Sequence, residues 1–398
     1  MPKVMIIFGT RPEAIKMAPV VLAFLNSKLW ETVVCVTAQH REMLDMVLNV
    51  FNITPQYDLN IMKKKQPLPI ITSRVIKGLT PIIKKEKPDV ILVHGDTSTT
   101  MAASLAAFYE KIPVGHVEAG LRTNDLYIPF PEEMNRRVTD SLCSFLFAPT
   151  KRAVNNLLKE GVAKEKIVLT GNTVIDALLT VVNRDSPHPD LLPQGAKEIK
   201  NVWEELGYTK LNNYRVILAT AHRRESWGEG IKNISEAILA LVEQFKDTAA
   251  LVSVHPNPIV KDMVKEILKK HERIIISEHI DYVPFCKAMS ASYIILTDSG
   301  GIQEEAPTLG KPVLVMRDVT ERPEAIEAGT ARLVGAHKEN IIKHAGLLLG
   351  IENEYNKMSK AVNPYGDGKA AMRILTSLSY SFGLTKKRSR ELLTLPLF

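Results

Sequence analysis

The sequence predicts an α/β protein built from two doubly wound domains, each with a parallel sheet between layers of helices. Three observations lead to this prediction. Short apolar runs that end in Gly, Asp or His alternate with helical stretches, as parallel βα units require. Between Arg184 and Tyr214 the chain loses strand character and carries several prolines, and after this stretch the alternation starts again. With 398 residues the chain is also too long for one ordinary core.

The first domain is predicted over residues 1–180, from six apolar runs that are each followed by a polar loop or a helix. The first run leads into a loop with Arg11 and a helix to about Asn26, and the second leads into an amphipathic helix near residues 43–51. The third run ends just before Asp96 and the fourth just before Glu118. The six predicted strands are residues 4–8, 32–37, 90–93, 113–117, 145–148 and 167–170.

The second domain is predicted over residues 181–365 and repeats this layout, with a first strand that runs into the cationic loop at His222. Its predicted strands are residues 216–219, 250–254, 274–276, 293–297 and 312–316. A last helix over about 369–380 is expected to pack on the first domain, which assigns residues 366–385 to it, and the tail from Lys386 is expected to be unstructured. Because ligands bind beyond the carboxyl ends of parallel strands, we expect these two edges to face each other across a cleft.

Composition excludes several classes of protein. The hydrophobic share of 45% and charged share of 24% are typical of a folded globular chain, and no apolar run approaches the roughly 20 residues of a membrane span. We expect no leader peptide, and we interpret three scattered cysteines as reduced core residues of a cytoplasmic protein without a metal site. The net charge of +7 is spread along the chain without a nucleic-acid motif, so we expect a small anionic substrate and no nucleic-acid partner.

Three carboxylates follow strands of the first domain: Asp96, Glu118 and Glu132. Asp96 could instead cap the next helix. Glu132 could simply suit a helix's first turn and pair with Arg136 four residues on. Glu118 has no such simple alternative. Taken together, the three predict a site where carboxylates converge on one carbon and share acid and base roles.

The second domain carries groups suited to a nucleotide. Ser299, Gly300 and Gly301 end a strand and enter a helix, so backbone N–H groups can approach a phosphate. Glu305 could bind ribose hydroxyls or only complement the helix dipole, and Phe285 could stack on a base or belong to the core. Arg322 could bind phosphate or form a surface ion pair. The dinucleotide and P-loop glycine patterns are absent from the strand-to-helix turns, so we expect no dinucleotide cofactor.

Eight motifs in this order resemble the non-hydrolysing UDP-N-acetylglucosamine 2-epimerases, bacterial type. They are FGTRPEA (8–14), HGDT (94–97), VEAGLR (117–122), PEE (131–133), HRRE (222–225), DSGGIQEEA (298–306), TERPEA (320–325) and NPYGDG (363–368). The resemblance implies two Rossmann-like domains in a GT-B-like pair. It implies reversible epimerisation of UDP-GlcNAc to UDP-ManNAc through loss of UDP, a 2-acetamidoglucal and re-addition, which supplies ManNAc for surface polysaccharides without an added cofactor.

The resemblance also assigns roles to residues of this chain. It implies catalysis by Asp96, Glu118 and Glu132 with help from His222, a homodimer, and an allosteric UDP-GlcNAc site at Gln39, Glu42 and Lys65. Substrate binding is implied for Arg11, Lys16, Arg136, Ile280, Phe285, Ser299, Gly300, Gly301, Glu305 and Arg322. Four alternatives stay open: a hydrolysing epimerase, a GT-B glycosyltransferase, an epimerase of a UDP-diacetamido-uronic acid, and a basic nucleic-acid-binding protein.

Overall fold

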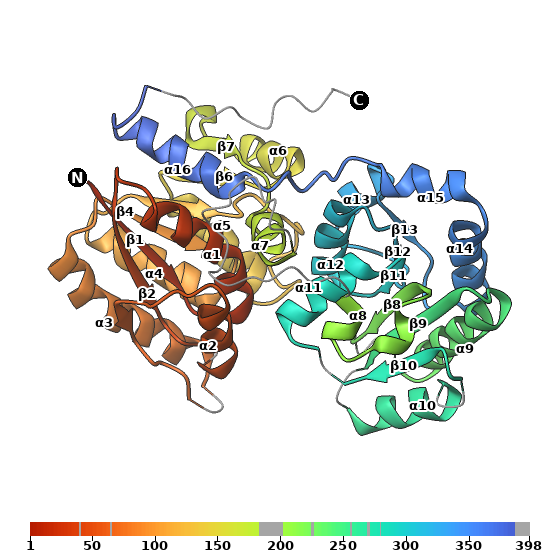
Figure 1. The fold of residues 1–398 in the computed structure, drawn as a ribbon. Coiled ribbons are helices and arrows are strands. Elements are labelled where there is room, and N and C mark those ends of the chain that lie inside the picture. Colours follow the sequence, from red (N-terminus) through yellow and green to blue (C-terminus); the bar gives the residue numbers. More distant parts are fainter. Residues whose placement is uncertain are drawn as a thin grey trace. The chain divides into compact units, whose positions relative to one another are not determined.

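The computed structural model describes residues 1–39, 41–63, 66–182, 202–223, 227–254, 257–268, 271–278 and 280–386. The chain divides into two compact units, one formed by Met1–Gly195 with Tyr365–Phe398 and the other by Ala196–Pro364 (Figure 1). Most of the proline-containing stretch after Arg184, and the tail beyond Lys386, lie outside the described residues. Within the described residues no helix is long and apolar enough to cross a membrane.

The first unit contains a seven-stranded parallel sheet with the order β3-β2-β1-β4-β5-β6-β7. All six predicted strands are confirmed, but the count of six was wrong, because β3 is a two-residue strand without an apolar run that the pattern missed. The strands are β1 (Lys3–Phe8), β2 (Glu31–Val36), β3 (Tyr57–Asp58), β4 (Val90–His94), β5 (Val114–Val117), β6 (Phe145–Ala148) and β7 (Ile167–Leu169).

Helices cover both faces of this sheet, which explains why its central strands are buried and mostly apolar. On one face α3 and α4 pack their Val, Leu, Ile and Ala side chains against β1, β2 and β4. On the other, α1 packs against α7 and α16. The helices are α1 (Arg11–Leu25), α2 (Arg41–Val50), α3 (Leu68–Glu86), α4 (Ser98–Tyr109), α5 (Glu132–Leu142), α6 (Lys151–Lys159), α7 (Thr173–Val182) and α16 (Ala370–Ser381).

The last helix returns to the first unit through specific contacts. Asp176 of α7 accepts hydrogen bonds from the backbone N–H groups of Ala370 and Ala371, where α16 begins. At the other end of α16, the indole N–H of Trp30 donates to Ser379 Oγ. These bonds hold α16 at both ends.

The second unit repeats the topology with a six-stranded parallel sheet, order β10-β9-β8-β11-β12-β13. The five predicted strands are confirmed and β13 was missed, because its three residues are interrupted by the charged Arg332 and form no continuous apolar run. The strands are β8 (Arg215–Ala221), β9 (Thr248–Val254), β10 (Ile274–Ser277), β11 (Ile294–Thr297), β12 (Val313–Val315) and β13 (Ala331–Leu333). The helices are α8 (Val202–Glu205), α9 (Glu229–Gln244), α10 (Pro258–Leu268), α11 (Tyr282–Ala291), α12 (Gly300–Glu305), α13 (Pro323–Glu327), α14 (Lys338–Gly350) and α15 (Glu352–Ser359).

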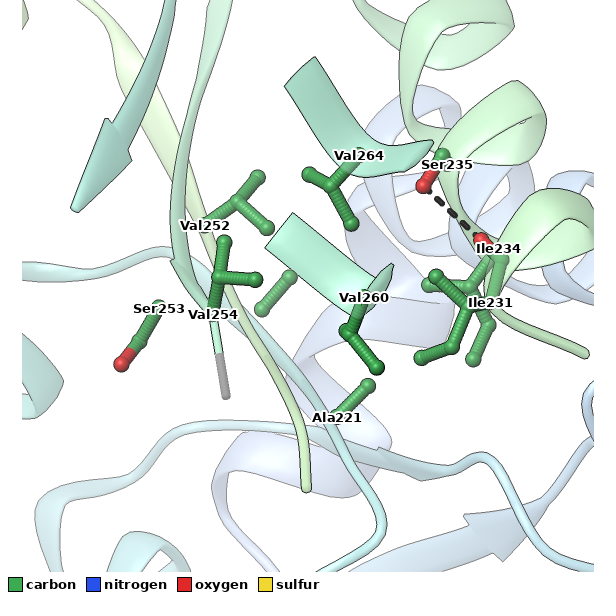
Figure 2. Close-up of a pocket in the computed structure, with 10 residues that line it drawn as sticks. Ala221, Ile231, Ile234, Ser235, Val252, Ser253, Val254, Val260 and Val264 are labelled. Atoms are coloured by element: carbon green, nitrogen blue, oxygen red, sulfur yellow. Dashed lines mark hydrogen bonds between the residues drawn. The ribbon is translucent and has the colours of Figure 1, made fainter. Parts of the chain in front are cut away.

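A cavity of about 10 Å³ lies in this unit between β8, β9, α9 and α10 (Figure 2). Its wall is almost entirely Ala, Val and Ile, and the one hydroxyl on α9, that of Ser235, donates to the carbonyl of Ile231. A dry apolar space of this size is a packing gap in the core and has no groups to bind a polar ligand.

Both sheets have a topological switch point, where the strand order reverses beside the first strand of the unit. In the first unit this point lies between β1 and β4, and in the second between β8 and β11. Ligands of doubly wound sheets bind at the carboxyl ends of these strands. The loops to consider are therefore those after Phe8 and His94 in one unit, and those after Ala221 and Thr297 in the other.

Candidate functional site

A buried carboxylate organises the switch-point loops of the first unit. Thr10 caps α1 in a capping box, and Arg11 is the first helical residue. Glu13 Oε2 accepts from the backbone N–H groups of Gly9 at 3.0 Å and Thr10 at 2.7 Å. Its Oε1 accepts from the hydroxyls of Thr97 at 2.7 Å and Thr100 at 2.9 Å. Glu13 therefore joins the loop that carries Arg11 to the loop that follows β4.

Glu118 lies at the centre of the candidate site. Its φ of 71° is in the left-handed region, which is unusual for a residue other than glycine and is a form of backbone strain found at functional sites. Lys16 Nζ forms an ion pair with Glu118 Oε2, and Asn172 Nδ2 donates to the same oxygen at 3.0 Å. The structure thus brings two sequence-predicted residues together, Lys16 from α1 and Glu118 after β5.

A neutral histidine faces this carboxylate. His94, the last residue of β4, has its Nε2 atom 3.8 Å from Glu118 Oε2. Burial lowers the pKa of His94 to about 4, against the opposing effect of the nearby Glu118 charge. Neither ring nitrogen of His94 has a hydrogen-bond partner among the residues that the structure describes. His94 therefore presents a neutral imidazole, able to donate or accept a proton, beside Glu118.

Asp96 lies on the adjoining loop and pairs with Arg136. The expectation that Asp96 could cap α4 was wrong, because Thr97 is the cap and accepts from Thr100 N–H at 3.1 Å. A Cβ atom placed on Gly95 would lie 3.9 Å from Glu118 Oε1, so the Glu118 carboxylate lies against the residue that precedes Asp96. Two of the three predicted carboxylates are therefore on touching loops.

The predicted ion pair between Glu132 and Arg136 in the first turns of α5 was wrong. Glu132 does not pair with Arg136; that guanidinium bonds to Asp96 and to Glu133 Oε2, the latter at 3.1 Å. Glu133 is fully buried and also pairs with Arg137, whereas Glu132 is only half-buried at the start of the helix. Glu133 therefore holds two arginines of α5 in place, whereas Glu132 takes part in none of these ion pairs.

In the second unit a buried aspartate orders the loop after β8. Asp298 is fully buried, and its Oδ2 accepts from the backbone N–H groups of His222 and Arg223, both at 2.8 Å. The switch-point strands β8 and β11 are further joined where the hydroxyls of Thr220 and Thr297 lie 2.7 Å apart. The structure therefore holds the predicted His222 beside the predicted Ser299 loop, while Arg224 lies outside the described residues.

The residues predicted to bind phosphate and ribose gather around two glycines. A Cβ atom on Gly300 would lie 3.9 Å from the Arg322 guanidinium, and one on Gly301 would lie 3.9 Å from Glu305 Oε2 and 4.0 Å from Ser299 Oγ. The absence of side chains here leaves room for a ligand against the backbone. The structure therefore brings Arg322, Glu305 and Ser299 together, as the motif predicts.

Two alternatives for these residues were wrong. Glu305 is the last residue of the six-residue helix α12, where a carboxylate cannot complement the helix dipole, and it is buried. Arg322 does not form a surface ion pair; it bonds through Nε to Glu304, whose side chain is only 3% exposed. Glu305 is thus fixed by burial and Arg322 by its bond to a buried carboxylate, and side chains held in this way suit a ligand-binding role.

Two further predicted groups lie on or beside α11. Phe285 is the fourth residue of α11, half-buried and outside the main apolar core of the unit, and Ile280 is half-buried just before the helix. The interpretation of Phe285 as an ordinary core residue is therefore not favoured.

Two of the three predicted allosteric residues, Gln39 and Glu42, lie within the described part of the chain. Gln39 Oε1 accepts from the Thr99 hydroxyl at 2.9 Å, which connects it to the start of α4. Glu42 is exposed in the first turn of α2, and Lys65 lies outside the described residues.

Sequence reasoning missed four residues at these loops: Glu13, His94, Asn172 and Asp298. Three of them, Glu13, His94 and Asp298, lie within motifs that the sequence analysis singled out. Each lies close to side chains or backbone of another loop, so position in the sequence alone did not reveal their roles. Among the described residues no group of three His, Cys, Asp or Glu side chains could hold a metal ion, and all three cysteines are buried and outside disulfide bonds.

Comparison with known proteins identifies the family of this chain. Residues 23–379 match the sequence model of the family described as UDP-N-acetylglucosamine 2-epimerase. The chain belongs to this family. It is 53% identical to the UDP-N-acetylglucosamine 2-epimerase of Salmonella typhimurium, over 96% of this chain and 100% of the relative.

Solved structures of the family share the fold. The UDP-GlcNAc 2-epimerase from Neisseria meningitidis bound to UDP-GlcNAc is 49% identical, with a TM-score of 0.85 over 95% of this chain and 100% of that chain. The enzyme from Methanocaldococcus jannaschii is 38% identical, with a TM-score of 0.80 over 95% of this chain and 99% of that chain. The predicted membership of the family is thus confirmed, together with an α/β fold that is GT-B-like.

Proposed function

We propose that the protein reversibly epimerises UDP-N-acetylglucosamine at C2 to UDP-N-acetylmannosamine. The observation that carries this proposal is the Glu118 carboxylate, held by Lys16 and Asn172 beside the neutral imidazole of His94. A further carboxylate, Asp96, lies on the touching loop. The names of the similar proteins and the UDP-GlcNAc bound to the Neisseria structure support the same substrate.

The chemistry explains why several carboxylates are needed. The hydrogen on C2 is not adjacent to a carbonyl, so its direct removal is unfavourable. When the C1–O bond breaks and UDP departs with the electron pair, C1 gains oxocarbenium character and the C2 hydrogen becomes acidic. A carboxylate then takes the C2 proton, and the C–H electrons form the C1–C2 double bond of 2-acetamidoglucal.

The return step reverses this sequence on the other face of the ring. A protonated group delivers a proton to C2 from the opposite side, and a UDP oxygen attacks C1. We assign these proton transfers to Glu118, Asp96 and Glu132. His94 and Lys16 are next to Glu118 and can carry its proton between the two half-reactions. The overall reaction is an isomerisation, so no electrons are gained or lost.

The second unit is proposed to hold UDP. The Arg322 guanidinium over Gly300 and the backbone N–H groups around Ser299 would bind the pyrophosphate, together with Arg11 and His222. Glu305 would accept from the ribose hydroxyls, and Phe285 with the backbone of Ile280 would flank the uracil. Exclusion of water from the site would keep the glycal from being hydrolysed.

We also propose that the enzyme acts as a cytoplasmic homodimer and supplies ManNAc for a surface polysaccharide. The family resemblance supports this proposal. Light scattering coupled to size-exclusion chromatography measures the oligomeric state directly, and a monomeric mass with full activity would contradict the dimer.

Proton NMR of the protein with UDP-GlcNAc in D₂O, with nothing else added, tests the proposed reaction. We expect a second UDP-sugar anomeric signal and deuterium at C2 of both sugars. Free ManNAc with UDP would instead show a hydrolysing epimerase. An unchanged spectrum with retained binding would contradict the proposal and direct the search to modified UDP-sugars such as diacetamido-uronic acids, then to glycosyl acceptors.

A further inference from the structure

One histidine to which no catalytic or binding role has been assigned lies in β5, the strand that leads to Glu118. His116, in β5, is completely buried between two acceptors. Its Nδ1 atom lies 2.6 Å from Asp140 Oδ1, and its Nε2 atom lies 2.7 Å from the carbonyl oxygen of Gly95. A carbonyl oxygen can only accept, so Nε2 must carry a hydrogen.

The other side of Asp140 determines where the second hydrogen lies. Its Oδ2 accepts from the backbone N–H of Gly120 at 3.2 Å and forms an ion pair with Arg122 Nη2 at 2.7 Å. Asp140 is therefore a carboxylate that accepts on both oxygens, and Nδ1 of His116 donates to it. With hydrogens on both nitrogens, His116 is an imidazolium.

The cluster is closed to solvent at its centre. The side chains of His116, Arg122 and Asp140 are 0%, 2% and 3% exposed. Arg122 also pairs at 2.7 Å with the more exposed Glu160, which Arg137 approaches at 3.6 Å. Asp140 is therefore the buried acceptor of the cluster, with donors on both of its oxygens, as a buried charge requires.

This cluster joins the three segments that carry the proposed catalytic carboxylates. The Gly95 carbonyl immediately precedes Asp96, and the Gly120 N–H follows Glu118 by two residues. Asp140 belongs to α5, the helix that begins at Glu132. On the far side, the N–H groups of Glu118 and Ala119 both donate to the carbonyl of Phe147 at 3.1 Å, so the left-handed backbone at Glu118 is held from two directions.

We propose that His116 and Asp140 are positioning residues, whose buried imidazolium–carboxylate pair sets the relative places of Asp96, Glu118 and Glu132. This inference rests on the proposed function, because the distances that it fixes matter for proton transfer at one carbon. Misplacement of a catalytic group by about 1 Å can cost about 100-fold in rate.

The test compares Asp140→Asn with Thr139→Val, after wild-type epimerisation has been established. Thr139 is the matched control, because it is buried on the same helix and its hydroxyl bonds only to the Asn135 carbonyl. An asparagine cannot accept on both sides, so the donors at His116 and at Gly120 compete for its one oxygen. We expect kcat to fall by about 100-fold or more with KM for UDP-GlcNAc within about threefold. Thr139→Val should keep kcat within about twofold at a similar Tm.

A second readout does not depend on turnover. In protein labelled with ¹⁵N-histidine, we expect one of the ten histidines to show both ring nitrogens protonated and hydrogen-bonded, and this signal to vanish in His116→Gln and change in Asp140→Asn. A neutral ring at His116, or equal loss of kcat in Asp140→Asn and Thr139→Val, would overturn the inference while leaving the proposed function intact. A wild type that shows the imidazolium but does not epimerise would instead count against the proposed function.

Discussion

Replacement of Glu13 tests how far the strand-end loops depend on one buried carboxylate. Glu13→Ala leaves the N–H groups of Gly9 and Thr10 without their acceptor, and each buried unpaired group costs about 1–3 kcal/mol. The hydroxyls lose less, because that of Thr100 can donate to the His94 carbonyl instead. From these lost bonds we expect a destabilisation of about 3–5 kcal/mol and a fall in Tm of about 10 °C.

Glu13→Gln should be much milder. Its amide oxygen can still accept from both N–H groups, and the threonine hydroxyls can turn to accept from its NH₂. Burial raises the pKa of Glu13 above its ordinary value, against the opposing effect of its hydrogen bonds, so loss of the charge offsets part of the lost bonding. We expect a cost of about 1 kcal/mol.

The matched control is Asp176→Ala, which also deprives two backbone N–H groups of a buried carboxylate, but at the start of α16. Thermal unfolding and steady-state kinetics are measured for all three variants. We expect Glu13→Ala to lower kcat/KM by at least about 100-fold, because Arg11 and Asp96 lie on the loops that Glu13 joins. Asp176→Ala should lower Tm comparably and keep kcat/KM within about threefold. Activity losses that simply follow Tm in both variants would refute the reasoning.

Four further outcomes are expected. Glu118→Gln should keep UDP affinity, measured by calorimetry, while turnover falls by about 10³-fold; unchanged turnover would remove Glu118 from the mechanism. His94→Gln should make the protein less sensitive to acid. The pKa of His94 is about 4 in the fold against 6.5 in the unfolded chain, so the free energy of unfolding should decline by at most about 3 kcal/mol as the pH falls from 6.5 towards 4. Urea titrations of the wild type and the variant at both pH values measure this difference. Arg322→Ala should weaken UDP binding by about 10–100-fold and also lower Tm, because the buried Glu304 carboxylate loses this partner; an unchanged Kd would place the pyrophosphate elsewhere. Asp298→Ala should weaken UDP binding too, whereas Asp298→Asn keeps one oxygen for the N–H groups of His222 and Arg223 and should retain it within about fivefold.

Much of the fold could be predicted because parallel strands buried on both faces are apolar along their length. β4 illustrates this, since all five of its residues are buried and the first four are apolar. The method failed where a short strand has no continuous apolar run. β3 has two residues and β13 three, and both are defined by pairing with a neighbouring strand that the local sequence does not reveal.

The sequence was enough to predict which residues belong to the candidate site, but not which side chains those residues bond to. Asp96 and Glu118 were found because they follow strands, a rule that needs only local sequence. That Asp96 bonds to Arg136, 40 residues away, depends on how α5 packs beside β4 and β5. The same applies to Glu118, whose partners Lys16 and Asn172 come from positions 102 and 54 residues distant. Long-range side-chain contacts have no local signature.

The two units solve the same structural problem with carboxylates from different places. At a switch point the two central loops must stay together although no strand pairing continues beyond the sheet. In the first unit Glu13, from the helix after β1, bonds to both loops. In the second, Asp298 follows β11 and reaches back to the N–H groups after β8. A carboxylate suits this task because it accepts several N–H and O–H bonds at once, and each bond to its charge is stronger than a neutral one. Arg11 and His222 thus lie on loops that are each held by a buried carboxylate, and such preorganisation would lower the cost of binding the phosphate groups proposed for them.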